Sequence, residues 1–212
     1  ASDGAKNDYF GRSVAVAGDT IFVGAYGDDD DGTNSGSVYV FRTTDGGATY
    51  DEVETLKASS PKAGANFGNA LAADGDTLVI GAYSDNSYKG AVYVFRKSGS
   101  TYAQVARLTG SGVASDDEFG TSVDVSGDTI VVGTEYTDAA FVYRTSDGGA
   151  TWAAVTTLEG SDDFGQSVAI DGDTIVIGAS GGDATYVYRT SDGGATYVEV
   201  AKLTAPESLS PE

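Results

Sequence analysis

The 212-residue sequence contains no cysteine, no histidine and no methionine, and only three prolines. Without cysteine it forms no disulfide and no thiolate metal site, and without histidine it lacks the commonest zinc ligand and general base. The absence of methionine leaves room for a signal peptide or further domains upstream of the given sequence. No stretch is apolar for the roughly 18 residues that a membrane-spanning helix needs, so we expect no membrane insertion.

Positive charge is also scarce. There are 12 Lys and Arg residues against 32 Asp and Glu residues, which gives a formal net charge of -20. Nucleic acids and anionic membrane surfaces would be repelled by such a surface, whereas cations would be attracted. Solubility, calcium coordination and adaptation to a salty medium are all compatible with this acidity.

Glycine and tyrosine are plentiful, with 30 and 13 residues, a composition typical of strands and tight turns. The sequence repeats: a Phe-Gly pair occurs four times, and the successive Phe residues are 57, 52 and 45 positions apart. The pairs are Phe10-Gly11, Phe67-Gly68, Phe119-Gly120 and Phe164-Gly165. A period of this size suits one four-stranded unit of a repeat protein.

Each unit continues in the same way. A short apolar segment leads through a Gly-Asp turn into a second apolar strand, and after a variable loop a third strand ends at an arginine, namely Arg42, Arg96, Arg144 or Arg189. A fourth segment has an aromatic residue, a valine and a leucine at three-residue spacing, as in Tyr50, Val53 and Leu56. This spacing differs from the period of two of a flat strand, so we expect an outer strand with a bulge or strong twist.

These patterns predict an all-β fold, a β-propeller-like array of four four-stranded antiparallel blades. The units span residues 1–57, 58–109, 110–159 and 160–205 of a single repeat domain, with 206–212 as a tail or the start of a further repeat. Strands one and two are apolar on both faces, as expected when blades pack face to face. A flat stack of units or a β-sandwich is the structural alternative.

The motifs resemble FG-GAP repeats, which are found in the integrin α head and in many secreted microbial proteins. Unit one carries the clearest match, over residues 8–14, 24–26 and 36–41. The resemblance implies a propeller and an extracellular or cell-surface location. The integrin-type calcium loop between the first two strands does not carry over, because only Ala17, Gly18 and Asp19 stand there. Family propellers usually have seven blades, so four units predict a small closed ring, half of a dimeric ring, or an excerpt of a longer array.

The hairpin between strands three and four resembles the Asp-box of sialidase-type propellers. Residues 145–152 read TSDGGATW, with near copies at 43–50 and 190–197, whereas unit two has lost the pattern. We interpret the hairpin as a folding element, a turn bonded to itself that contains positive φ angles. We also expect the strand-ending arginines to pair with Asp45, Asp147 and Asp192 rather than to form the arginine cluster of a sialidase.

The variable loops of all four units should meet at one end of the blades, and variation indicates a working face. These loops hold 16 of the acidic residues against three lysines. Within them, Asp28, Asp30 and Asn34 are candidate ligands of Ca²⁺, which prefers oxygen donors, and Asp116 and Asp162 are weaker candidates. A solvated acidic turn is the alternative interpretation.

Aromatic side chains on the same face, Tyr26, Tyr83, Tyr88 and Tyr136, are candidates for binding a sugar or a protein partner. We therefore predict a non-catalytic extracellular adhesion module that is not an enzyme, has no catalytic residues and binds a protein or glycan, with calcium as its candidate cofactor. A structural subunit of a filament or surface layer, self-associating through edge strands at Ala1 and at 198–203, is the alternative. A sialidase-like glycoside hydrolase is the third.

Overall fold

The computed structural model describes residues 3–205, and the predictions made for Ala1 and for 206–212 lie outside them. The described residues form four four-stranded antiparallel sheets, each built from four consecutive strands in sequential order. The first two blades are β1 (Val14–Ala17), β2 (Thr20–Ala25), β3 (Ser37–Arg42), β4 (Asp51–Leu56) and β5 (Leu71–Asp74), β6 (Thr77–Ala82), β7 (Ala91–Ser98), β8 (Thr101–Leu108). The last two are β9 (Ser122–Ser126), β10 (Thr129–Gly133), β11 (Ala139–Arg144), β12 (Ala153–Glu159) and β13 (Phe164–Asp171), β14 (Thr174–Ala179), β15 (Ala184–Arg189), β16 (Val198–Thr204). The predicted propeller-like array of four blades is confirmed.

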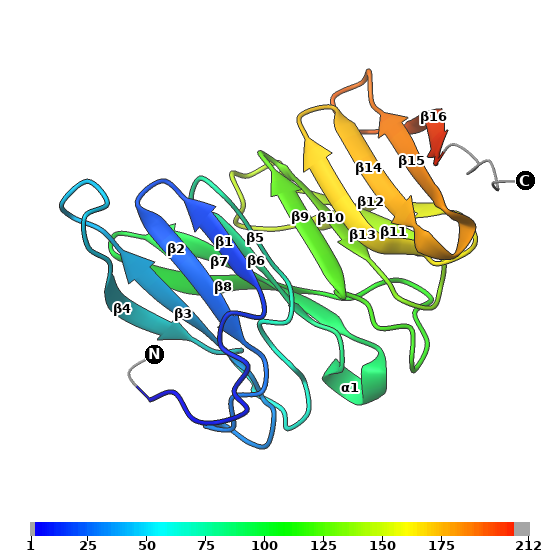
Figure 1. Cartoon of the computed structure of the whole chain (residues 1–212). Helices are drawn as coiled ribbons and strands as arrows, with labels where there is room; N and C mark the ends of the chain where they lie inside the picture. Colours follow the sequence, from blue (N-terminus) through cyan, green and yellow to red (C-terminus); the bar gives the residue numbers. More distant parts are fainter. Residues whose placement is uncertain (1–2, 206–212) are drawn as a thin grey trace, which may run out of the picture.

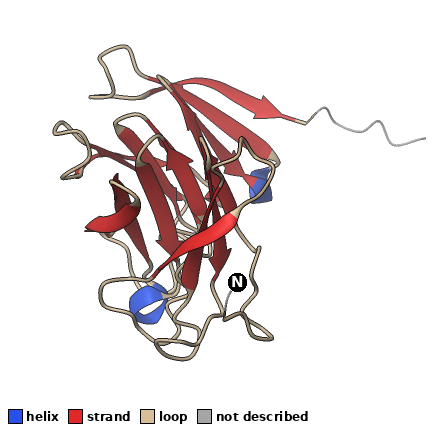
Figure 2. Cartoon of the chain, turned by 90° about the vertical axis from the view of Figure 1, so that its left-hand side faces the viewer, coloured by secondary structure: helices blue, strands red, loops and turns tan. Residues whose placement is uncertain are grey.

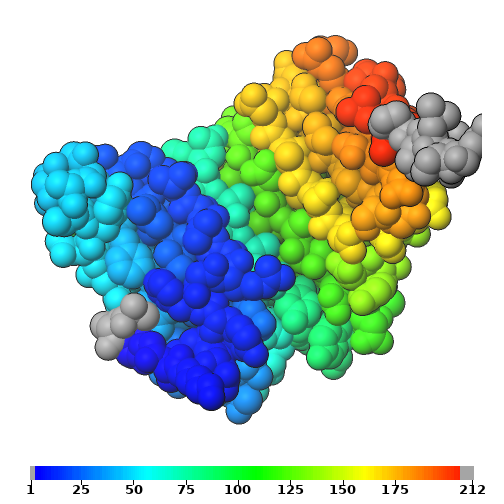
Figure 3. All heavy atoms as spheres, viewed as in Figure 1, coloured from blue at the N-terminus to red at the C-terminus, as the bar shows by residue number. Residues whose placement is uncertain are grey.

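The blades are arranged as an open arc (Figure 1). The first strand of each blade packs against the first strand of the next, from β1 through β5 and β9 to β13, so these strands line the inside. The first and last blades lie on opposite sides of the molecule in the space-filling view (Figure 3). This arrangement excludes the flat stack and the β-sandwich.

Tight turns join the first two strands of every blade. Ala17 pairs with Thr20 across a two-residue turn, and Gly18 in that turn has a φ of 56°. A positive φ costs glycine little because it has no Cβ, and such turns match the twist of the flanking strands. Gly75, Gly127 and Gly172 repeat this backbone conformation in the other blades.

The outer strand of each blade contains the predicted irregularity. The pairing between strands three and four shifts register once in every blade, for example between Val40 and Phe41. In blade 1, Val40 pairs with Glu54 and Phe41 pairs with Glu52, which leaves Val53 as the extra residue of a bulge. The bulge explains the three-residue spacing of the sequence, and this prediction is confirmed.

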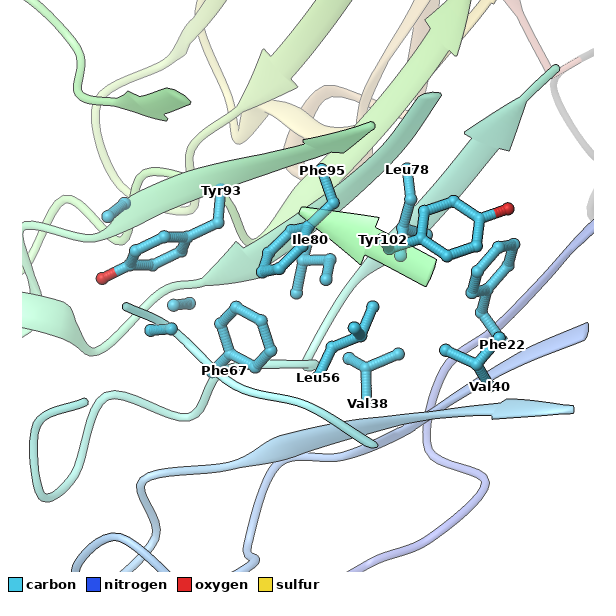
Figure 4. Packing of buried hydrophobic residues seen from close by; sticks show 13 residues of the cluster. Phe22, Val38, Val40, Leu56, Phe67, Leu78, Ile80, Tyr93, Phe95 and Tyr102 are labelled. Carbon is cyan, nitrogen blue, oxygen red and sulfur yellow. The ribbon is translucent and has the colours of Figure 1, made fainter. Parts of the chain in front are cut away.

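The core lies between the blades, in three apolar layers. In the first layer, Val38, Val40 and Leu56 of blade 1 face Ile80 and the other side chains of blade 2 (Figure 4). Blades 2 and 3 and blades 3 and 4 are joined by equivalent layers. Each inner blade therefore buries both faces, as its near-continuous apolar strands predict.

The strand-ending arginines are placed differently from the prediction. Arg96 donates to the hydroxyl of Thr77 at 2.7 Å, and Arg144 donates to Thr129 at 3.2 Å. In the described part of the chain, none of them forms an ion pair with the hairpin aspartates. The predicted Arg–Asp pairing is wrong because each hairpin aspartate is already bonded within its own turn, as Asp147 is by Thr145 and Thr151.

Candidate functional site

The variable loops lie together at one end of the blades, as predicted. They include the short helix α1 (Asp85–Tyr88) of blade 2 and the 3-10 turn at Ser180–Gly182 of blade 4. In Figure 2, the strands run from the end where α1 and these loops lie to the end where the tight hairpins lie. In the described residues, no helix is long and apolar enough to cross a membrane.

A pocket of about 550 Å³ opens among these loops, and all four blades contribute to it. Blades 1 and 4 supply Arg12, Tyr26 and Gln166, while the remaining side chains come from blades 2 and 3 and the loop between them. We call this cavity the axial pocket. Its lining residues are Arg12, Tyr26, Asn69, Tyr83, Tyr88, Glu118, Thr121, Glu135, Tyr136 and Gln166.

All four tyrosines that the sequence singled out line the axial pocket. Tyr26 stacks on Tyr9 with ring centroids 4.9 Å apart, and the rings of Tyr83 and Tyr88 lie 6.3 Å apart. Tyr136 is 66% exposed, so most of its ring is free to contact a ligand. Residues more than 100 positions apart in the sequence thus form one aromatic surface. Their binding role stays a prediction.

Two carboxylates of the axial pocket were not predicted as site residues. Glu118 and Glu135 come from the two loops that flank β9 and β10, and a backbone hydrogen bond from Glu135 to Asp117 joins these loops. Burial, together with the nearby charges of Glu135 and Asp116, raises the pKa of Glu118. The sequence shows only an acidic residue before an aromatic one in each case, a pattern too common to single out the pair.

Polar donors complete the lining. Gln166 donates to Glu135 at 2.9 Å, which ties blade 4 to the loop of blade 3. Arg12 supplies a positive charge from blade 1, and Asn69 supplies an amide from blade 2. A cavity with aromatic rings, carboxylates, amides and one guanidinium can hold a ligand rich in hydroxyl groups.

The structure brings two of the five predicted metal ligands together. Carboxylate oxygens of Asp28 and Asp30 lie within 4.8 Å of each other and of Asp3. Asp28 is buried and accepts hydrogen bonds from the Tyr39 hydroxyl at 2.8 Å and from the Asp30 amide at 3.0 Å. Burial, together with the hydrogen bonds that the Tyr39 hydroxyl donates to Asp28 and Asp3, raises the pKa of Tyr39 far above its ordinary value. Three carboxylates suit a hard cation such as Ca²⁺, and this use stays a prediction.

The other predicted ligands lie apart from that cluster or bond elsewhere. Asn34 is exposed, and its backbone amide donates to Asp29 at 2.6 Å. Asp116 and Asp162 are exposed residues of later loops, and neither belongs to a group of three acidic residues among residues 3–205. Asp162 accepts a hydrogen bond from Ser161.

Blade 2 shows what a cation does at the position equivalent to Asp28. Asp85 is fully buried and accepts from the Tyr93 hydroxyl, as Asp28 does from Tyr39, but Lys62 and Arg107 also reach it at 2.7 Å. Burial alone would raise the pKa of Asp85, yet the hydrogen bonds from Lys62, Arg107 and Tyr93 outweigh it and lower the pKa. Asp85 therefore ties the loop in place.

Comparison with known proteins identifies the repeat. A family model of the FG-GAP repeat matches residues 1–41, 50–95, 102–152 and 158–199. No curated protein matches the sequence.

Among solved structures, a Lactobacillus plantarum protein aligns with a TM-score of 0.65 at 16% identity, over 94% of this chain and 57% of its own. A protein from Bacteroides uniformis, provisionally named a 6-phosphogluconolactonase, aligns with a TM-score of 0.65 at 12% identity, over 93% and 57%. A periplasmic gluconolactonase of Pseudomonas aeruginosa aligns with a TM-score of 0.64 at 14% identity, over 93% and 58%. The chain thus spans less than three fifths of the length of these structures, and the likeness shows the fold.

These structures correct one prediction. The missing histidines and the unclustered arginines predict a protein that is not an enzyme. Two of the structures with this fold carry lactonase names, so the fold accommodates hydrolases and the prediction is overturned. Glu118 is a carboxyl group of the axial pocket with a raised pKa that sequence reasoning did not identify.

Proposed function

Because the chain belongs to the FG-GAP repeat family, we propose that it is a binding module of the propeller type whose axial pocket holds a glycan. The observation that carries the proposal is the gathering of Tyr26, Tyr83, Tyr88 and Tyr136 around Glu118 and Glu135 in one pocket. Tyrosine rings offer apolar faces to the C–H groups of a sugar, and the polar side chains accept and donate hydrogen bonds to its hydroxyls.

The acidity of the loop face supports a neutral or cationic glycan over an acidic one. Glu118 and Glu135 line the pocket, and Asp116 and Asp163 lie close enough to act on its acidic and phenolic groups. Arg12 is the arginine of the pocket, and one guanidinium does not balance two carboxylates there. An extracellular adhesion role, with calcium at Asp28 and Asp30 holding the loop of blade 1, is part of this proposal.

The test is a glycan-array screen followed by calorimetric titration of the best ligand, in calcium chloride and again in EDTA. Tyr136→Ala removes an exposed ring of the pocket and is expected to weaken binding about tenfold, a loss of about 1.4 kcal/mol. Tyr50→Ala is the matched control, because Tyr50 is 43% exposed and lies outside the pocket. Equal affinities of Tyr136→Ala and the unchanged protein would rule out the axial pocket as the binding site.

A second candidate function is hydrolysis of a sugar-derived lactone in the same pocket, and the raised pKa of Glu118 beside Glu135 favours it. Glu135 would take a proton from water as the water oxygen adds to the carbonyl carbon. Glu118 would give its proton to the ring oxygen as the C–O bond breaks. Turnover of sugar lactones that is lost in Glu118→Gln, while ligand binding persists, would support hydrolysis. An undiminished rate would exclude Glu118 as the acid.

A further inference from the structure

Each junction between blades uses the same backbone contact. The carbonyl oxygen of a Phe-Gly glycine lies against a glycine of the preceding blade, where a Cβ would come within 1.9 to 2.2 Å of it. The facing pairs are Gly24 with Gly68, Gly81 with Gly120, and Gly133 with Gly165. At two junctions a serine of the preceding blade also donates to that carbonyl, from Ser13 to Gly68 at 2.6 Å and from Ser122 to Gly165 at 2.9 Å.

The phenylalanine of the same pair fills an apolar site at each junction. Phe67 is 1% exposed, and Phe119 and Phe164 are 0% exposed. Figure 4 shows Phe67 of blade 2 lying beside Leu56 of blade 1 and below the ring of Tyr93. At each junction, the phenylalanine ring and the glycine carbonyl oxygen of one blade therefore pack against a glycine and a leucine of the preceding blade.

The Phe-Gly pair of blade 1 has no preceding blade to pack against among the described residues. Phe10 is 45% exposed, although its ring packs edge-on against Tyr39 at 5.5 Å, as Phe67 packs on Tyr93 at 5.4 Å. The Gly11 amide donates to Gly24 at 3.0 Å, and the Gly68 amide donates to Gly81 at the same distance. The side chains of Val14 and Val16 are 65% and 66% exposed. We call this surface the Phe10 face.

Blade 4 has the surface that receives the next blade in blades 1 to 3, and no blade packs on it among the described residues. A cavity of about 490 Å³ is lined by Ser167, Gly178, Thr185 and Leu203, the counterparts of Ser13, Gly24, Val38 and Leu56 in blade 1. Leu203 is 55% exposed, whereas Leu56, Leu108 and Leu158 are 4%, 6% and 6% exposed. A Cβ on Gly178 would meet Ser167 alone, because no following blade is present among the described residues. We call this cavity the Gly178 groove.

The two surfaces are also complementary in one hydrogen bond. At the junction of blades 3 and 4, the Phe164 amide donates to Asp138 of the preceding blade at 3.1 Å. Asp183 in the Gly178 groove is the counterpart of Asp138, because each stands directly before the alanine that begins the third strand of its blade. A copy docked as the inner blades are docked would place the Phe10 amide beside this carboxylate.

We propose that the Phe10 face of one copy of this chain docks into the Gly178 groove of a second copy. The partner is a second copy because this chain already makes the same junction three times with itself, each time with a Phe-Gly pair on one side and a glycine and a leucine on the other. The interface is heterologous, so it closes into a ring if the rotation allows. Two copies would form a ring of eight blades, within the range of known propellers. The contact is between blade faces, not between strand edges.

The experiment measures the mass of the chain in solution by light scattering over a wide range of concentrations. The unchanged protein is expected to have the mass of two chains. Gly178→Ala places a methyl group where the incoming carbonyl must lie, and only the flexible Ser167 hydroxyl stands in its way within one copy. Val16→Asp places a charge on the Phe10 face. Each variant is expected to keep its melting temperature as a monomer and to associate at least tenfold more weakly.

Two controls make the result specific. Ser100→Asp adds the same charge at an exposed hairpin tip of blade 2 and is expected to leave the two-chain mass unchanged. A mixture of Val16→Asp and Gly178→Ala retains one intact junction, so two-chain particles should reappear. Longer polymers that both variants abolish would also support this docking. They would show that the rotation between docked copies does not close a ring of two chains. A monomeric unchanged protein, or association that neither variant affects, would overturn the proposal.

Discussion

At the scale of single residues, the hairpins between strands three and four of blades 1, 3 and 4 are each held by one aspartate. Asp147 accepts hydrogen bonds from Thr151, through both its hydroxyl at 2.6 Å and its amide at 2.9 Å, and from Thr145 at 2.8 Å. The hydrogen bonds from Thr151 and Thr145 hold the pKa of this carboxyl well below its usual range. Asp45 and Asp192 repeat the arrangement.

These hydrogen bonds to an ionised carboxylate make the stability of the hairpin depend on pH. A carboxyl whose pKa is lowered on folding contributes stability above its unfolded pKa, about 3.9 for aspartate, and loses it as the pH falls toward the folded pKa. We expect the melting temperature to drop below about pH 4, and Asp147→Asn to lower it at neutral pH and flatten the drop. Thr151→Ser keeps both donors and is the control. An unchanged pH profile of Asp147→Asn, measured by circular dichroism, would contradict this role.

Sequence reasoning at the residue scale succeeded where the chemistry is local. The turn residues of 145–152 bond to one another, so their pattern alone indicated a self-bonded turn. It failed for the partners of Asp85, because Lys62 and Arg107 lie 23 and 22 positions away on either side. It likewise missed Glu118 and Glu135, which become a pair only through the packing of two loops.

At the scale of elements, the close approach of backbones fixes how the blades stack. Gly133 in β10 lies against the carbonyl oxygen of Gly165 in β13, and a Cβ there would come within 1.9 Å of that oxygen. A backbone carbonyl held between two strands does not move aside as a side chain does. The glycine of the second strand is thus required by the neighbouring blade.

We expect Gly133→Ala to destabilise the junction of blades 3 and 4 by about 3 kcal/mol, at the upper end of the cost of overpacking. For a chain of this size, that loss lowers the melting temperature by about 6–12 °C. Gly178→Ala is the matched control when both variants are made in the monomeric Val16→Asp background, since it changes the same position of blade 4 and within one copy no backbone lies in the way there. Calorimetry of the two variants compares them directly, and equal melting temperatures would show that the junction tolerates the methyl group.

The strands and turns were predictable because the same motifs recur in each of the four repeats. Four Phe-Gly pairs and four Gly-Asp turns fixed the strand order, and the spacing of Tyr50, Val53 and Leu56 indicated the bulge. The role of the repeated contact between Gly24 and Gly68 was not predictable, because it joins glycines from different blades and leaves no pattern within one unit.

At the scale of the whole molecule, the arc is open and strongly acidic. Four blades cover 57% of the Lactobacillus plantarum structure, so that chain has room for roughly three more blades of the same size. The sequence predicted the number of blades in this chain and left closure open, because closure depends on the angle between blades. That angle arises from packing in the three layers between the blades.

The net charge makes the self-association of the chain depend on salt. Each copy carries a formal charge of -20, so two copies repel each other, and this repulsion is screened over about 8 Å at physiological ionic strength. The apolar contact of Phe10, Val16 and Leu203 is not weakened by screening. We therefore expect the dissociation constant of the two-chain particle to fall at least tenfold from low salt to physiological salt, as measured by analytical ultracentrifugation. Val16→Asp is the control and should stay monomeric throughout. A dissociation constant that instead rises with salt would show that ion pairs hold the copies together.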